Sequence, residues 1–367
     1  MQLLRFPVAA LIALSAPLYS QTPSTPLRVG VVGLVHGHVA GFFSAAIGRS
    51  DIQIVGVTEP DRQLFDRYAQ QYRLDPNLHF STLAEMISRA HPQAVLVYTN
   101  TFDHRKIVEE SARRGVHVMM EKPLAVSYED ARAIADAAQK SKIHVLVNYE
   151  TTWYASNEAA YEMLHQGTVG DLRKVVVHDG HPGPKEIHVQ PEFFAWLTDP
   201  KLNGAGALYD FGCYGADLVT WLMQGQPPRT VTAVTQQIKR DIYPKVDDEA
   251  NVILTYPSAV AILQASWNWP FDRKDMEVYG RTGYVKTIVR DKIEFRREGQ
   301  KDAQTAPARA LLAPYDDPLH YLAALIKGKA HEDSLSSLNT NLIVSEILDA
   351  ARRSAESGKT VTLPLSQ

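Results

Sequence analysis

The sequence has little that could form disulfides, attract nucleic acid or cross a membrane more than once. Cys213 is the only cysteine in 367 residues, so no internal disulfide can form and the fold must be stabilised by core packing. We interpret Cys213 as a small buried hydrophobe, because the sequence places no base beside it that would make the thiol catalytic. The formal net charge is −3, with mixed signs and no run of like charges, so nothing favours nucleic acid as a partner.

The first twenty residues differ from the rest of the chain. The stretch MQLLRFPVAALIALSAPLYS has one Arg, an apolar run too short to span a bilayer comfortably, and small residues before Gln21. This pattern predicts a secretory signal peptide over residues 1–20, cut near Ser20, and a leader over 21–26. We therefore predict an exported protein, periplasmic or secreted, with no membrane span after cleavage; a retained anchor is the alternative.

Between residues 27 and 148, short apolar runs alternate with amphipathic helical stretches. Strands are predicted over 28–33, 52–59, 94–100, 116–123 and 143–149. This alternation predicts an α/β Rossmann domain, whose parallel sheet is covered by helices on both faces. Ligands of such sheets bind at the carboxyl ends of the strands.

After about residue 149 the pattern changes to period-two alternation separated by turn signals. The segments TVTAVTQQI, EANVILTY, AVAILQASWNW and MEVYGRTGYVKTIV have the spacing of antiparallel strands with one face on a core. Residues 149–367 are thus predicted to form a substrate-binding α+β domain with an open, mainly antiparallel sheet. A final helix, at about 338–357, is the segment that can pack back on the first domain.

The stretch RVGVVGLVHGHVAGFF begins like a nucleotide-binding strand, turn and helix. Aligning Gly33 with the first glycine of a dinucleotide-binding turn places Val35 at the second and His38 at the third, with Gly37 adjacent. The helix N-terminus can still receive an anion. His36 and His38 either donate to that anion or are polar residues of an exposed turn.

Glu59 ends the second predicted strand, roughly 20 residues beyond the turn, where an acid accepts hydrogen bonds from the adenosine ribose. An acid there repels a 2′-phosphate and favours NAD over NADP. The alternative is an ordinary surface carboxylate in the following loop.

Two longer motifs carry a family resemblance. They are GVHVMMEKPLAVS, over 115–127, and NGAGALYDFGCYGADLVTWLMQG, over 203–225; YTNTFDH, over 98–104, and the later segments VDDEANVILTY, EVYGRTGYV and DDPLHYLAALIKG agree with them. Together they resemble the Gfo/Idh/MocA oxidoreductase family, of the glucose–fructose oxidoreductase and inositol dehydrogenase type, over essentially the whole mature chain. The turn Gly-Leu-Val-His-Gly-His is atypical for it.

The resemblance implies NAD as the cofactor and a set of cofactor contacts along the carboxyl edge of the sheet. That set is Gly33, Val35, His36, Gly37, His38, Glu59, Thr99, Asn100, His104, Glu121, Lys122 and Asn148. It also implies that the Lys122–Pro123 peptide bond is cis.

Three residues are the predicted catalytic set: Lys122, Asp210 and Tyr214. An ammonium at the end of a parallel strand can hold a substrate hydroxyl and lower its pKa as hydride leaves the carbon. Family members commonly carry Asp and His four residues apart in the second motif, and this chain has Tyr214 in place of His. A phenol needs Lys122 nearby to act as a base near neutrality. Asp217, one turn later, either orients Tyr214 or caps the helix.

A histidine cluster is specific to this chain. His178, Asp179, His181 and His188 fall in one short span at a strand end. We interpret His178 and His181 as contacts to sugar hydroxyls, ahead of a metal site or plain loop polarity, and predict no metal. Trp196, and also Trp153, are candidate stacking platforms for a sugar ring, although core tryptophans are common.

These features predict an NAD-dependent oxidoreductase acting on a sugar, glycoside or polyol, forming a homo-oligomer through the open sheet. Because free NAD is not expected to be plentiful outside the cytoplasm, we expect a tightly bound cofactor that is recycled in place. A redox-neutral glycoside hydrolase or epimerase is one alternative. An exported sugar-binding protein with a vestigial cofactor site is the other.

Overall fold

The protein was analysed as a computed structural model, which describes residues 25–332 and 334–365. The predicted signal peptide, 1–20, and most of the predicted leader lie outside this range. Within it, no helix has the length and apolarity needed to span a bilayer.

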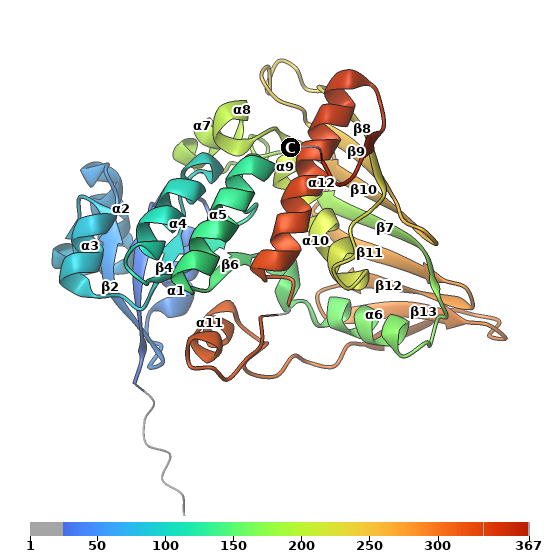
Figure 1. The fold of residues 1–367 in the computed structure, drawn as a ribbon, viewed down its shortest axis with the longest axis horizontal. Coiled ribbons are helices and arrows are strands. Elements are labelled where there is room, and N and C mark those ends of the chain that lie inside the picture. The colour runs from blue at the N-terminus through green and yellow to red at the C-terminus, as the bar shows by residue number, and fades with distance from the viewer. Residues whose placement is uncertain (1–24, 333, 366–367) are drawn as a thin grey trace, which may run out of the picture.

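The first domain is a six-stranded parallel sheet with strand order β3-β2-β1-β4-β5-β6 (Figure 1). Its strands are β1 Leu27–Val32, β2 Ile52–Thr58, β3 His79–Phe80, β4 Ala94–Val97, β5 His117–Glu121 and β6 Val145–Asn148. The order reverses between β1 and β4, and this is where open parallel sheets bind ligands. The predicted α/β Rossmann fold is confirmed.

Alternate side chains of these strands enter two separate cores, as the period of two requires. The helices α3 Leu83–Ala90, α4 His104–Ala112 and α5 Tyr128–Ser141 cover one face. The helices α1 Val39–Ala46 and α2 Arg62–Tyr72 cover part of the other face. Ser127 caps α5 by accepting a hydrogen bond from the Asp130 N–H at 3.1 Å, as the sequence predicts.

The rest of that second face is covered by α11, Pro318–Ile326, which comes from late in the chain (Figure 1). Leu319, Leu322 and Leu325 of α11 share a core with Met119 and Leu146 of the strands. The linear pattern of the sequence does not show this return, because α11 lies in the chain among elements of the other domain.

The second domain is a nine-stranded sheet with order β14-β13-β12-β11-β7-β10-β9-β8-β15. Its strands are β7 Leu172–Gly180, β8 Thr230–Gln236, β9 Glu249–Thr255, β10 Val260–Ser266, β11 Arg273–Gly280, β12 Gly283–Val289, β13 Lys292–Arg297, β14 Gln304–Pro307 and β15 Val361–Thr362. All its pairings are antiparallel except β7 with β10. The predicted α+β domain with a mainly antiparallel sheet is also confirmed.

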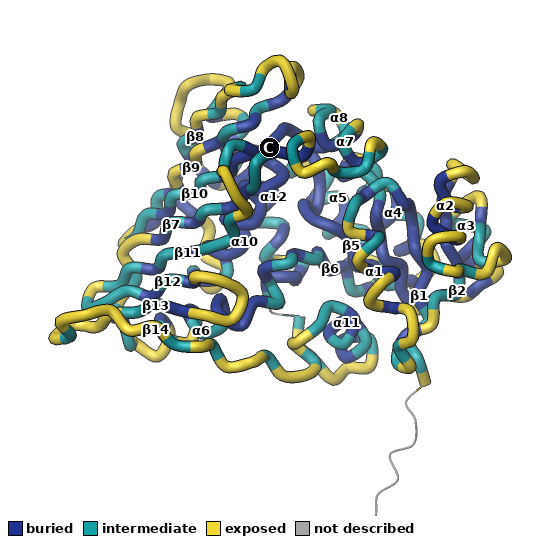
Figure 2. The backbone as a smooth tube through the Cα atoms, turned by 180° about the vertical axis from the view of Figure 1, so that it is seen from behind, coloured by how far each residue is buried: buried dark blue, intermediate teal, exposed yellow. Residues whose placement is uncertain are grey.

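Helices α6 Ala155–His165, α10 Gly212–Leu222 and α12 Leu338–Ser357 cover one face of this sheet. The 20-residue α12 packs against α10 and β8 and also against α5 of the first domain. Figure 2 shows buried chain in α10, α12 and the strands where the domains meet, and exposed chain in the loops at the far edges of the larger sheet. The short helices α7 Pro191–Leu197, α8 Pro200–Asn203 and α9 Ala207–Asp210 connect β7 to α10.

Candidate active site between the two sheets

The turn after β1 is fixed by hydrogen bonds to the Glu59 carboxylate. Gly33 adopts a φ of +80°, which suits glycine, and its N–H donates to the carbonyl of Thr58. The Glu59 carboxylate accepts from the Leu34 N–H at 2.8 Å and the Asp61 N–H at 3.0 Å. Glu59 is 4% exposed, and burial raises the pKa of its carboxyl group. Glu59, the predicted ribose-binding acid, therefore stabilises the conformation of the turn.

Helix α7 of the second domain packs against the turn. The Trp196 indole donates a hydrogen bond to the carbonyl of Val35 at 3.1 Å, and Arg67 forms an ion pair with Glu192. The side chain of Val35 packs against the hydrophobic cores. Trp196 itself is buried and bridges the two domains, and its role as a sugar platform stays a prediction.

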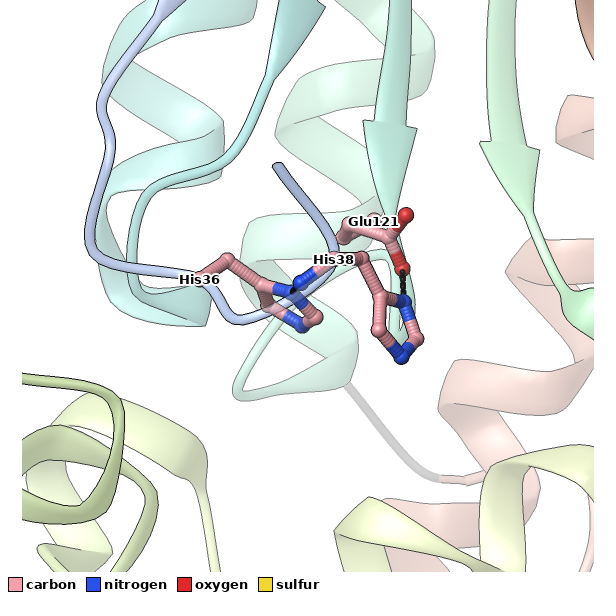
Figure 3. Close-up of side chains that lie close together, drawn as sticks. All are labelled: His36, His38 and Glu121. Atoms are coloured by element: carbon pink, nitrogen blue, oxygen red, sulfur yellow. Dashed lines mark hydrogen bonds and ion pairs between the residues drawn. The ribbon is translucent and has the colours of Figure 1, made fainter. Parts of the chain in front are cut away.

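His36 and His38 stand at the edge of this turn, next to the end of β5 (Figure 3). The rings are 4.7 Å apart, and Nδ1 of His38 lies 2.9 Å from a carboxylate oxygen of Glu121. His36 is 1% exposed, and burial lowers its pKa well below the usual value. Although burial raises the pKa of Glu121, the neighbouring His38 lowers it to about 2. Asn148, at the end of β6, donates to Glu121 at 3.2 Å.

The predicted contacts in the loop after β4 mainly build that loop. Asn100 accepts from the Asp103 N–H and donates to its carboxylate, and the Thr99 hydroxyl donates to the Asn100 carbonyl. His104 is buried, with Nδ1 3.1 Å from the carbonyl of Pro123, and burial lowers its pKa to about 4. The Lys122–Pro123 peptide bond is cis, as the resemblance implies.

The three predicted catalytic residues meet where β5 ends against α9 and α10. The Lys122 ammonium donates to the Asp210 carboxylate at 2.6 Å and to the Asp210 carbonyl at 3.2 Å. The indole N–H of Trp267 donates to the other Asp210 oxygen at 2.8 Å. Burial lowers the pKa of Lys122 and raises that of Asp210, but each charge outweighs this effect on its partner, so both stay ionised.

Two ammonium groups lie near the ring of Tyr214. Nζ of Lys122 is 5.4 Å from the centre of its ring and Nζ of Lys274 is 5.3 Å from it, and Lys274 also pairs with Glu150. The ring is 1% exposed and meets Tyr149 edge to face at 5.3 Å. Burial raises the pKa of Tyr214 well above its usual value, so the phenol holds its proton in the resting site.

The strand register separates the histidines of the β7 end. In the register of β7 against β11, His178 lies opposite Asp275 and Asp179 lies opposite Lys274. Because neighbouring residues of a strand alternate, His178 and Asp179 point to opposite faces of the sheet. His178 hydrogen-bonds to Asp275 at 3.0 Å, on the face away from Tyr214. The structure therefore does not bring His178 together with Lys122.

Asp179 and His181 do face the site. Asp179 is 2% exposed, one of its oxygens has no hydrogen-bond partner in the described part of the chain, and burial raises its pKa well above the usual range. The His181 ring meets Phe211 edge to face at 4.8 Å. Asp217, in contrast, is fully buried, and neither oxygen has a partner among the described residues, so it neither orients Tyr214 by a hydrogen bond nor caps a helix.

Three residues of the site were missed by sequence reasoning: Trp267, Lys274 and Glu150. Trp267 and Glu150 come from segments interpreted only as a strand or a strand end, and Lys274 lies just before the segment MEVYGRTGYVKTIV. The signal that could find them is the alternation of the strands, because Lys274 falls on the inward side of β11.

Comparisons with known proteins agree with this architecture. Residues 27–149 match the family model described as an oxidoreductase family with an NAD-binding Rossmann fold, and residues 157–286 match the GFO/IDH/MocA C-terminal domain. A trans-1,2-dihydrobenzene-1,2-diol dehydrogenase from Macaca fuscata fuscata is 27% identical over 237 residues, which is 64% of this chain and 66% of that protein. A dTDP-3,4-didehydro-2,6-dideoxy-α-D-glucose 3-reductase from Streptomyces antibioticus is 24% identical over 79% of this chain and 87% of its own length.

Solved structures share the fold. An inositol dehydrogenase homolog from Azotobacter vinelandii, complexed with NAD+, has a TM-score of 0.79 at 21% identity, covering 92% of this chain and 98% of that one. An aldose-aldose oxidoreductase from Caulobacter crescentus, complexed with glycerol, has a TM-score of 0.75 at 22% identity, covering 92% and 100%. With an NAD-binding Rossmann domain at residues 27–149 and the matching C-terminal domain after it, the chain belongs to the Gfo/Idh/MocA oxidoreductase family.

Proposed function

We propose that this protein is an NAD-dependent oxidoreductase acting on a hydroxyl-bearing carbon of a sugar, glycoside or polyol. The observation that carries the proposal is the buried Lys122–Asp210 ion pair beside Tyr214, at the carboxyl end of the Rossmann sheet. Charged groups kept in a buried site are costly, and they are typical of sites that stabilise developing charge.

The residues around the turn fit a dinucleotide. The N-terminus of α1 has no side-chain cap; the His38 and Val39 N–H groups donate to His36, and the next amides, of Ala40 and Gly41, remain available to a pyrophosphate. Glu59 lies at the end of β2, where the adenosine ribose binds in such folds, and Lys122 and Tyr214 lie at the nicotinamide side. When bound, the nicotinamide ring takes or returns a hydride.

The chain's own residues would hold the substrate and move one proton. Lys122 uses two of its three N–H groups on Asp210, so the third can donate to a substrate hydroxyl. Tyr214 holds its proton at rest and can give it to a carbonyl oxygen in the reducing direction. In the oxidising direction, Tyr214 would first release its own proton to water, and the resulting phenolate, with the Lys122 and Lys274 ammonium groups near its ring, would receive the hydroxyl proton. Asp179, whose pKa burial raises well above the usual range and one of whose oxygens has no partner in the described chain, offers a further hydrogen bond to a sugar hydroxyl.

A cofactor retained between turnovers is part of the proposal. The Trp196–Val35 hydrogen bond and the Arg67–Glu192 ion pair cover the turn, so a nucleotide can exchange only when α7 moves. Retention suits an exported protein, which the predicted signal peptide suggests, because a retained nicotinamide must return to its starting state in each cycle. Coupled oxidoreduction, epimerisation and redox-neutral glycoside cleavage all meet this condition.

The test is to denature the purified protein and identify the released nucleotide, then to supply sugars and glycosides without added NAD. We expect NAD(H) close to one per chain and several turnovers per enzyme. A 2′-phosphorylated nucleotide would contradict the assignment from Glu59. Strict dependence on added NAD, with one NADH formed per product, would contradict the retained cofactor and indicate a dehydrogenase that releases NADH in each cycle. Release of no nucleotide, with no binding on titration, would favour a sugar-binding protein.

We also propose that two copies associate through the open face of the larger sheet. Val234 and Ile253 lie on that face and are 61% and 42% exposed. Light scattering after size-exclusion chromatography should give at least twice the mass of one chain, and Ile253→Lys should reduce it.

A further inference from the structure

The residues that distinguish this turn from a glycine-rich one form a compact cluster with Glu121. One nitrogen of His36, one nitrogen of His38 and one carboxylate oxygen of Glu121 all lie within 4.8 Å of one another. Figure 3 shows the two rings side by side below the end of β5. Zinc takes nitrogen and oxygen ligands at about 2.0–2.2 Å, which places tetrahedral ligands roughly 3.4 Å apart. Shifts of about an ångström would therefore bring all three onto one ion.

The hydrogen bonds inside the cluster leave one nitrogen of His36 without a partner. Nδ1 of His36 accepts from the His38 N–H at 3.2 Å, and Nδ1 of His38 is bonded to Glu121. Nε2 of His36 is buried and has no hydrogen-bond partner in the described part of the chain. Because Nδ1 accepts, Nε2 of the neutral ring carries the proton, so a metal ion would bind Nε2 only after this proton leaves and the bond from the His38 N–H breaks. Buried polar atoms without a partner are uncommon in proteins, and such an atom needs an explanation, of which a bound water or ion is one.

The charge at the cluster suits a cation held by its side chains. Glu121 is a buried carboxylate, and the nearby Lys122 ammonium is already paired with Asp210. A divalent ion among His36, His38 and Glu121 would offset the Glu121 charge, and it leaves the amides of α1 available to a phosphate. His38 and Glu121 also line a cavity of 560 Å³ between α1 and α11, which gives an ion a route from solvent.

We propose that His36, His38 and Glu121 hold one divalent transition-metal ion, of the Zn²⁺ or Co²⁺ type, at the β1–α1 turn. Three protein ligands leave a fourth position for water or for an oxygen atom of a bound molecule. The site does not depend on the proposed oxidoreductase activity, since neither nicotinamide nor substrate is needed to observe it.

The experiment is metal binding by the full chain, purified without a polyhistidine tag and stripped with a chelator. Co²⁺ is added while its visible absorption is followed, and Zn²⁺ is then added to displace it. We expect one saturable, tetrahedral Co²⁺ site per chain. His38→Ala, at an exposed side chain, should abolish it, and Glu121→Gln should weaken binding roughly 10- to 100-fold.

The matched control is His144→Ala, which changes a second histidine bonded to a glutamate, Glu332, and should leave Co²⁺ binding unchanged. Far-ultraviolet circular dichroism checks that each variant folds, and His36→Gln replaces His38→Ala if that variant does not. The proposal is overturned if the wild-type chain shows no saturable Co²⁺ absorption. It is overturned equally if the His38→Ala variant binds Co²⁺ as the wild type does.

Discussion

The two ends of β5 carry almost the same set of side chains in different surroundings. At the carboxyl end, the His38 N–H donates to Nδ1 of His36, and Nδ1 of His38 is bonded to Glu121. At the amino end, the His144 N–H donates to Nδ1 of His117, and Nδ1 of His144 is bonded to Glu332 at 2.7 Å.

The difference is burial. The side chain of Glu121 is 2% exposed, whereas that of Glu332 is 29% exposed. The amino-end rings stack at 5.0 Å and 22°, whereas the carboxyl-end rings meet nearly edge to face at 65°. Among the described residues, only the carboxyl-end cluster brings three ligand atoms within reach of one ion. Residue types alone therefore do not make a site; the second domain does so by covering one end of the first sheet.

The largest expected effect is on chemistry. Lys122→Ala removes the charged donor to the substrate hydroxyl and should lower turnover about 100-fold, or ~3 kcal/mol of transition-state stabilisation. Steady-state rates on a sugar that the wild type turns over give the measurement. His117→Ala, at the other end of the same strand, should stay within two-fold of the wild type. Equal losses in the two variants would mean that the ends do not differ in function.

The next effect is on how the free energy of unfolding changes with pH. The pKa of Glu121 is about 2 in the folded chain, below that of an unfolded Glu, so its contribution is present above about pH 4.5 and is lost as the pH falls toward 2. A shift of this size is worth up to about 3 kcal/mol. Urea unfolding at pH 7 and pH 3.5 should show a smaller loss of free energy for Glu121→Gln than for the wild type. Glu332→Gln, at the exposed end, should lose as much as the wild type.

A smaller effect, on the rate of nucleotide exchange, is expected where α7 contacts the turn. Trp196→Phe keeps an aromatic ring but removes the hydrogen bond to Val35, which is worth about 1 kcal/mol, so nucleotide exchange should quicken about five-fold. Release of bound nucleotide into excess labelled NAD provides the rate. Gln93→Ala removes a hydrogen bond to Arg28 at the amino end and should leave exchange unchanged. An exchange rate for Trp196→Phe equal to that of the wild type would show that α7 does not limit release.

Periodicity was sufficient to predict the two sheets, because strands and helices alternate locally in the first domain and period-two strands follow in the second. The meeting of Lys122, Asp210 and Tyr214 was also predicted, from the resemblance and the four-residue spacing. What could not be predicted depends on pairing between distant segments. The register of β7 against β11 decides that Asp179 faces the site while His178 does not, and no local pattern contains that register. The contact of His38 with Glu121 joins residues 83 positions apart.

The return of α11 has a consequence for the order of assembly. Met119 and Leu146 belong to strands made early, but the leucines that cover them, Leu319, Leu322 and Leu325, are synthesised almost two hundred residues later. Until those residues emerge, one face of the first sheet presents an apolar strip to water or to a chaperone. A chain interrupted after residue 149 would therefore contain every strand of the Rossmann sheet and still lack part of its core. The first domain thus gains the last part of its core only when synthesis of the second is nearly complete.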